Sequence, residues 1–182
     1  MSSGLVAVVI GAGVVALVAI VLYNLLVSAR LRVREAWSSI DVQLQRRASL
    51  IPNLVEVVKG YASFERDTMT RVIAARTALG AAAGPREAAQ ANTALTAALG
   101  GLFAVVEGYP DLKANQRYAQ LQLDLADTEN KVAYARNYYN GAVELYNTRA
   151  QTFPAVLLAG PLGFKPAEFF TADAASAAVP QF

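Results

Sequence analysis

The sequence contains no cysteine and no histidine. Histidine is the commonest general base and metal ligand, and cysteine supplies the most reactive nucleophile. The chain also lacks a Gly-rich phosphate loop, a nucleophile elbow and the Glu-x-x-Glu pair that could replace a Glu-x-x-His metal motif in a bundle. We therefore expect no enzyme activity, no metal and no cofactor. One alternative stays open, a hydrolase formed by carboxylates such as Glu56 and Glu129 from separate helices.

Charge is scarce and unevenly distributed. Only 16 % of the residues are charged, and residues 1–29 contain none of them. At 1.5 Å per residue, the apolar run 5–27 spans roughly 34 Å, enough to cross a bilayer core of about 30 Å. The alternative is a cleaved signal peptide, which would need a basic start and a shorter apolar core. We expect an uncleaved transmembrane helix over residues 5–28, after a short tail, 1–4.

The positive charges predict the orientation of this helix. Arg30, Arg32 and Arg34 follow the apolar run directly, and no Lys or Arg precedes it. Positive residues stay on the cytoplasmic side, so we expect an outside N-terminus and a cytoplasmic domain. The three arginines are also candidate contacts to anionic lipid head groups, each contributing about 1 kcal/mol. The net charge of +2 is too small for a nucleic-acid footprint, so no nucleic-acid partner is expected.

Apolar residues at helical spacing predict an all-α fold after the span. No Gly or Pro interrupts residues 14–51, so the membrane helix is expected to continue to about Ala48. Ser49 is then a plausible N-cap, which places Pro52 in the first turn of a second helix over about 50–79. The stretch around Ser49 is thus predicted to be a hairpin.

Two further helices are predicted, over about 86–107 and 112–152, with Asp111 as a possible N-cap of the second. Short connections between four helices predict an antiparallel up-down four-helix bundle over 29–152. Residues 153–182 form a Pro-rich, irregular C-terminal tail. Its first half is apolar enough to pack on the bundle or on the membrane, and its end is expected to be partly disordered.

The last long helix carries the clearest pattern. Its apolar and small residues alternate in steps of four and three, which predicts a buried heptad stripe with coiled-coil-like packing. The members of this stripe are Leu121, Leu125, Thr128, Val132, Ala135, Tyr139, Ala142 and Tyr146. The two tyrosines need hydroxyl partners or exposed tips.

Polar residues follow one edge of the stripe. They are Gln122, Glu129, Arg136, Asn140 and Asn147, and Asn53 and Glu56 lie at the edge of the second helix. Two interpretations remain open: these side chains fix helix register or are simply solvated, or they form a recognition surface for another protein or a second copy. Glu129 and Arg136 are each expected to meet a side chain from a neighbouring helix.

Several motifs in one order resemble the LemA family of bacterial membrane proteins. They include "YNLLVSAR" at 23–30, "AWSSIDVQLQRRASLIPNLVEVVKGYA" at 36–62, "LFAVVEGYPDLKA" at 102–114 and "ARNYYN" at 135–140. The resemblance implies a single-pass protein of the bacterial inner membrane with a cytoplasmic helical bundle. It implies no reaction, cofactor or catalytic residue. The family often has an acidic residue at the position of Ser49 and a histidine at that of Phe64.

Together these features favour a non-enzymatic, membrane-anchored scaffold or interaction protein that binds an unknown protein partner and self-assembles. The candidate interaction residues are Asn53, Glu56, Glu129, Arg136, Asn140 and Asn147. The alternative is a protein that binds membrane lipids or a small ligand. It rests on the apolar segment 155–164 and on Arg30, Arg32 and Arg34.

Overall fold

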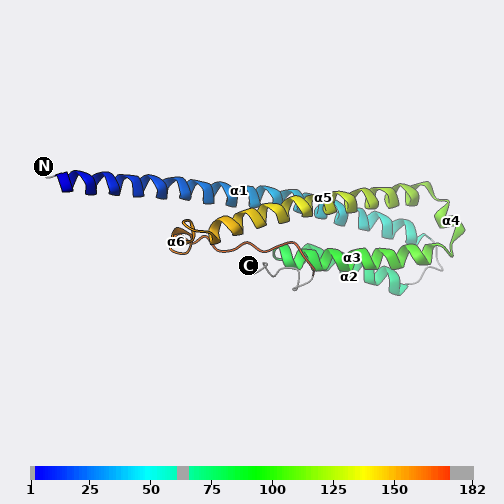
Figure 1. Ribbon diagram of the computed structural model, residues 1–182. Helices are drawn as coiled ribbons and strands as arrows, with labels where there is room; N and C mark the ends of the chain where they lie inside the picture. Colours follow the sequence, from blue (N-terminus) through cyan, green and yellow to red (C-terminus); the bar gives the residue numbers. More distant parts are fainter. Residues whose placement is uncertain (1–2, 61–65, 173–182) are drawn as a thin grey trace. The chain divides into compact units, whose positions relative to one another are not determined.

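The computed structural model describes residues 3–60 and 66–172, and every regular element in these ranges is a helix (Figure 1). The helices are α1 (Ser3–Lys59), α2 (Arg66–Ala81), α3 (Pro85–Val106), α4 (Pro110–Lys113), α5 (Gln116–Gln151) and α6 (Val156–Ala159). The predicted all-α class with an N-terminal apolar helix is confirmed. Phe64 lies outside the described residues, and so does the tail after residue 172, which is most of the part predicted to be disordered from about Thr171.

The predicted hairpin around Ser49 is wrong, because α1 continues through it to Lys59. The Ser49 hydroxyl donates to the carbonyl of Arg46, 2.7 Å away, and caps no new helix. Pro52 lacks the N–H that would bond the carbonyl of Ala48. A proline inside a helix normally destabilises it strongly for this reason. Here Arg76 of α2 supplies the missing donor, since its Nε lies 3.2 Å from the Ala48 oxygen. The helix therefore tolerates Pro52, and α2 begins at Arg66.

Among the described residues, two helices are long and apolar enough to cross a membrane, α1 and α3. A third of the most apolar 18-residue stretch of α3 is buried, including Leu95 and Leu102, as expected for a core helix of a folded domain. The corresponding stretch of α1 has no buried residue, and the large apolar side chains of this helix from Leu5 to Val21 are exposed. Of the two, α1 therefore has the character of a membrane span.

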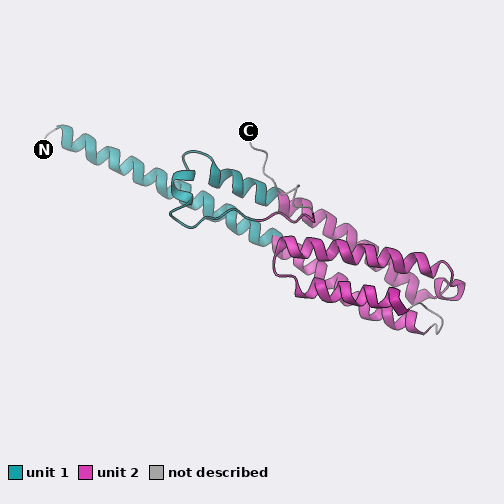
Figure 2. Ribbon diagram, turned by 90° about the horizontal axis from the view of Figure 1, so that it is seen from below, with its two compact units in different colours: residues 1–36, 141–167 teal, residues 37–140, 168–182 magenta. Residues whose placement is uncertain are grey.

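The chain forms two compact units (Figure 2). Unit 1 comprises residues 1–36 and 141–167, and its core includes Leu26, Val143 and Tyr146. Unit 2 comprises residues 37–140 and 168–182. Figure 2 shows the helical segments of unit 2 lying alongside one another.

The predicted stripe on α5 is buried throughout, from Leu121 to Tyr146. A matching stripe runs along the part of α1 in unit 2, again in steps of four and three. Its buried members are Ile40, Leu44, Arg47, Ile51, Leu54 and Val58. One of the six is an arginine, and this residue organises the site described below.

The helix connections agree with the sequence in one place and differ in another. Gly84 has φ 115°, a conformation that favours glycine, and α3 begins at Pro85, one residue before the predicted start. Asp111 was expected to cap the last long helix. Instead, Asn115 Oδ1 accepts hydrogen bonds from the N–H groups of Arg117 and Tyr118, so Asn115 caps α5.

Candidate functional site

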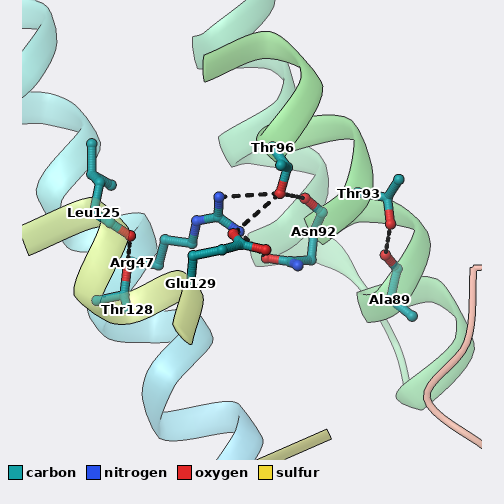
Figure 3. Close-up of polar contacts among 8 residues, drawn as sticks. All are labelled: Arg47, Ala89, Asn92, Thr93, Thr96, Leu125, Thr128 and Glu129. Atoms are coloured by element: carbon teal, nitrogen blue, oxygen red, sulfur yellow. Dashed lines mark hydrogen bonds and ion pairs between the residues drawn. The ribbon is translucent and has the colours of Figure 1, made fainter. Parts of the chain in front are cut away.

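A buried arginine joins three helices of unit 2. The Arg47 side chain is 3 % exposed and extends from α1 to Asn92 and Thr96 on α3 and Glu129 on α5 (Figure 3). Its Nη1 forms an ion pair with Glu129 and donates to the Asn92 amide oxygen, and its Nη2 donates to the Thr96 hydroxyl at 3.1 Å. The sequence prediction that Glu129 meets a side chain from a neighbouring helix is confirmed.

The two partners of the ion pair have different access to water. Burial lowers the pKa of Arg47, and the Glu129 carboxylate opposes that shift. The Glu129 side chain is 41 % exposed and can be hydrated. The Arg47 side chain is buried, so its charge must be stabilised by other protein groups. Its Nε is buried and has no hydrogen-bond partner among the described residues. Glu129 therefore neutralises a buried cation and also presents an oxygen to solvent.

A cleft of about 440 Å³ opens beside this network in unit 2. Asn92 and Glu129 line it, so its wall includes two of the groups that hold Arg47. The other polar side chains lining it are Thr93, Arg136, Asn137, Asn140 and Thr171. An open cleft with a cation, a carboxylate and several amides is suited to binding a polar ligand through hydrogen bonds and charge.

Arg136 is the exposed cation of this cleft. Within residues 3–60 and 66–172, its guanidinium has no ion pair or hydrogen bond, although the sequence predicted a partner from a neighbouring helix. The neighbouring Asn137 is also exposed. Both side chains can therefore meet a ligand without first breaking a described contact.

Asn140 and Asn147 hold the chain that follows α6. In unit 2, Asn140 accepts from the N–H of Phe170 at 2.9 Å and donates to the carbonyl of the same residue at 3.4 Å. In unit 1, Asn147 makes the same two bonds with Ala167, at 2.8 and 3.0 Å. Each amide thus bonds both backbone groups of one residue, as a neighbouring strand would.

The tyrosine before each asparagine contributes one more bond. Tyr139 donates to the carbonyl of Glu168 at 2.7 Å, and Tyr146 donates to that of Lys165 at 2.8 Å. The expected hydroxyl partners are therefore confirmed. Burial raises the pKa of Tyr139 to about 12, with the nearby Glu168 adding to the shift. The repeated Tyr-Asn pair has a structural role in both units.

The remaining predicted residues lie elsewhere. Asn53 and Glu56 are exposed on α1, and Glu56 lines an apolar groove of about 340 Å³ with Ile51 and Ile73. Glu56 and Glu129 line different concave surfaces, so the structure does not bring the two carboxylates into one site. Gln122 is exposed on α5. In unit 1, Arg30, Arg32 and Arg34 are all exposed.

Arg47, Asn92 and Asn137 were not among the site residues predicted from the sequence. Arg47 lies in the apolar stripe of α1, between Leu44 and Ile51, and the supposed hairpin at Ser49 interrupted that pattern. Extending the heptad count through Pro52 would have placed the arginine in the core. Within the described residues, no three His, Cys, Asp or Glu side chains are grouped closely enough to hold a metal ion.

Comparison with known proteins gives one family and several relatives. The model of the LemA family matches residues 36–182. Two magnetosome proteins of Paramagnetospirillum magneticum, MamQ 1 and MamQ 2, are each 29 % identical over 185 residues, covering 86 % of this chain and 68 % of the relative. Protein LemA of Metamycoplasma hominis is 24 % identical over 122 residues, covering 66 % of this chain and 56 % of its own.

Proposed function

This chain belongs to the LemA family, and on that premise we propose that it is a non-enzymatic, single-pass membrane protein whose helical domain binds a protein partner through the cleft of unit 2. The exposed apolar run of α1 supports the membrane anchor. The arginines after that run favour an outside N-terminus and a cytoplasmic unit 2. The heptad stripes of α1 and α5 favour an antiparallel up-down four-helix bundle in unit 2.

The observation that carries the proposal is the arrangement of Arg136. It is an exposed guanidinium in a concave surface, without a described ion pair, beside a carboxylate and several amides. A guanidinium binds a carboxylate through two parallel hydrogen bonds, which gives direction as well as charge. The amides of Asn137 and Asn92 offer further donors and acceptors. The partner that best suits this cleft is a protein segment with an acidic side chain.

In-cell photocrosslinking tests the proposal. A photoreactive residue at Asn137, which lines the cleft, is compared with one at Gln120, which is exposed on the same helix outside it. We expect one defined protein adduct from Asn137 and a much weaker one from Gln120. Equal adducts at both positions, or none at Asn137 when the protein is present at normal level in the membrane, would refute the cleft as the binding surface.

A second candidate function is recognition of anionic lipids, supported by the exposed arginines of unit 1. Arg30, Arg32 and Arg34 are exposed just after the apolar run of α1, where lipid phosphates would meet the helix. Native mass spectrometry of the protein released from nanodiscs tests it. Retained anionic lipid should be lost when the three arginines are changed to glutamate. Unchanged retention would exclude these residues as the lipid site.

A further inference from the structure

The chain between Gln151 and Lys165 in unit 1 is an uncharged apolar segment. It includes the short helix α6 and leaves several large apolar side chains in contact with solvent. Phe153 is 80 % exposed and Leu157 is 66 % exposed, and Val156 and Leu162 are also exposed. So many exposed apolar groups within ten residues indicate an interaction surface.

This segment packs beside the end of the apolar run of α1, within the same unit. A small cavity of about 180 Å³ is lined by Leu22 and Leu25 of α1 together with Phe153 and Pro154. The ring of Phe164 packs edge-on against Tyr23, with the ring centroids 5.8 Å apart. The exposed apolar surface of the segment therefore continues the exposed apolar surface of α1.

Many backbone groups of the segment are hydrogen-bonded to nearby groups of the chain. The N–H groups from Val156 to Ala159 and from Leu162 to Phe164 all donate to nearby carbonyls, including Phe164 to Ala159 at 2.9 Å. Pro154 and Pro161 have no N–H to satisfy. Unbonded backbone groups are the main cost of placing irregular chain in lipid, and these bonds lower that cost.

Basic residues flank the apolar surface in the same unit. Arg149 precedes the segment, Lys165 follows it, and Arg30 lies a short distance along α1 from Leu25. An apolar centre with positive flanks is typical of elements that lie at the boundary between acyl chains and anionic head groups. The charge pattern thus favours a lipid surface over an apolar protein face as the occupant.

We propose that residues 153–162 form a second membrane-contacting element, which inserts Phe153, Leu157 and Leu162 into the bilayer where α1 leaves it. This inference rests on the proposed membrane span of α1. It adds that unit 1 is seated in the head-group region by two elements far apart in the sequence. The bound partner is the lipid bilayer itself.

Site-directed spin labelling tests the inference, because the chain has no native cysteine. Three single variants, Leu157→Cys, Val15→Cys and Tyr134→Cys, carry a nitroxide in the full chain. Each is reconstituted in vesicles of phosphatidylcholine and phosphatidylglycerol. Val15 lies within the proposed span, and Tyr134 is 80 % exposed in unit 2. The measurement is the ratio of collisions with oxygen, which enters lipid, to collisions with a water-soluble nickel chelate.

We expect a several-fold higher ratio at Leu157 and Val15 than at Tyr134. A ratio at Leu157 equal to that at Tyr134, with Val15 still in lipid, would overturn the inference and leave the span standing. A label at Leu157 shielded from both reagents would also overturn it, in favour of a protein covering the segment. An aqueous ratio at Val15 would refute the span itself. Phe153→Cys repeats the measurement at a second exposed position.

Discussion

The cleft of unit 2 and the apolar segment of unit 1 present opposite chemistry to their surroundings. The cleft exposes Arg136 and part of Glu129 above a buried arginine, whereas residues 153–162 expose Phe153 and Leu157 over an internally bonded backbone. Helices α1 and α5 contribute to both units. The cleft is lined by residues of α3, α5 and the chain after residue 168, whereas the apolar segment follows α5, so the two kinds of surface come from different stretches of the sequence.

The largest expected effect comes from leaving the buried cation of unit 2 without its counter-ion. Glu129→Ala should lower the free energy of unfolding by about 3 kcal/mol, because breaking a buried pair leaves an uncompensated charge. Arg47→Met should cost less, since the half-exposed Glu129 that remains can be solvated by water. Denaturant unfolding of both variants in detergent measures this. A larger loss for Arg47→Met would contradict the assignment of Arg47 as the buried partner.

The two asparagines give a direct comparison between the units. Asn147→Ala should cost about 2 kcal/mol, because Asn147 is buried and two backbone groups of Ala167 lose their partner. Asn140→Ala should cost less, since Asn140 is half-buried and one of its bonds is 3.4 Å long. Hydrogen exchange at the amides of Ala167 and Phe170 reports each site. If neither variant lowers the protection of its own amide, Ala167 for Asn147→Ala and Phe170 for Asn140→Ala, the bonds do not hold the segment.

Pro52 and Arg76 form a coupled pair within unit 2. Arg76→Ala should cost about 1 kcal/mol by leaving the Ala48 carbonyl without a donor. In the Pro52→Ala background the helix provides its own N–H, so the same change should cost less. The coupling energy from this double-mutant cycle is the measurement. Strict additivity would mean that Arg76 does not compensate for the proline.

The last effect is absent at neutral pH and is a loss of stability at high pH. The pKa of Tyr139 is about 12 in the folded protein against an ordinary value of 10.0, so its stabilising contribution is complete below pH 10. Between the two values the unfolded chain ionises first, and stability should fall as pH rises. Tyr139→Phe should flatten this part of the unfolding profile, while Tyr134→Phe, at an exposed position, should not. Equal profiles for both variants would contradict the shift.

Helical periodicity was sufficient to predict the fold class, the N-terminal apolar helix and the buried stripe of α5. Each of these depends on a pattern repeated over many residues, which local exceptions cannot hide. The boundary between α1 and α2 was mispredicted because Pro52 and Ser49 are both good signals of a helix start. Tertiary contacts override them: Ile51, Leu54 and Val58 stay buried beyond the serine, and Arg76, far away in the sequence, bonds the Ala48 carbonyl.

The cleft was only partly predictable. The spacing along α5 placed Glu129, Arg136 and Asn140 on one edge, and all three line the cleft. Asn92 and Arg47 could not be added, because their contribution depends on which helices are neighbours. Asn140 and Asn147 lie on the same edge of the α5 stripe as Arg136. Unlike Arg136, each bonds the backbone of the chain that follows α6. Sequence periodicity places a side chain on a face and leaves its partner undetermined.

The central claim, that the cleft binds a partner through Arg136, is tested most directly by the yield of the Asn137 crosslink in two arginine variants. Arg136→Ala removes the exposed cation at little expected cost to the fold, and Arg117→Ala removes an exposed arginine of the same helix outside the cleft. At equal protein level and equal melting temperature, we predict loss of the adduct in Arg136→Ala and a normal adduct in Arg117→Ala. The same yield in both variants would contradict the account.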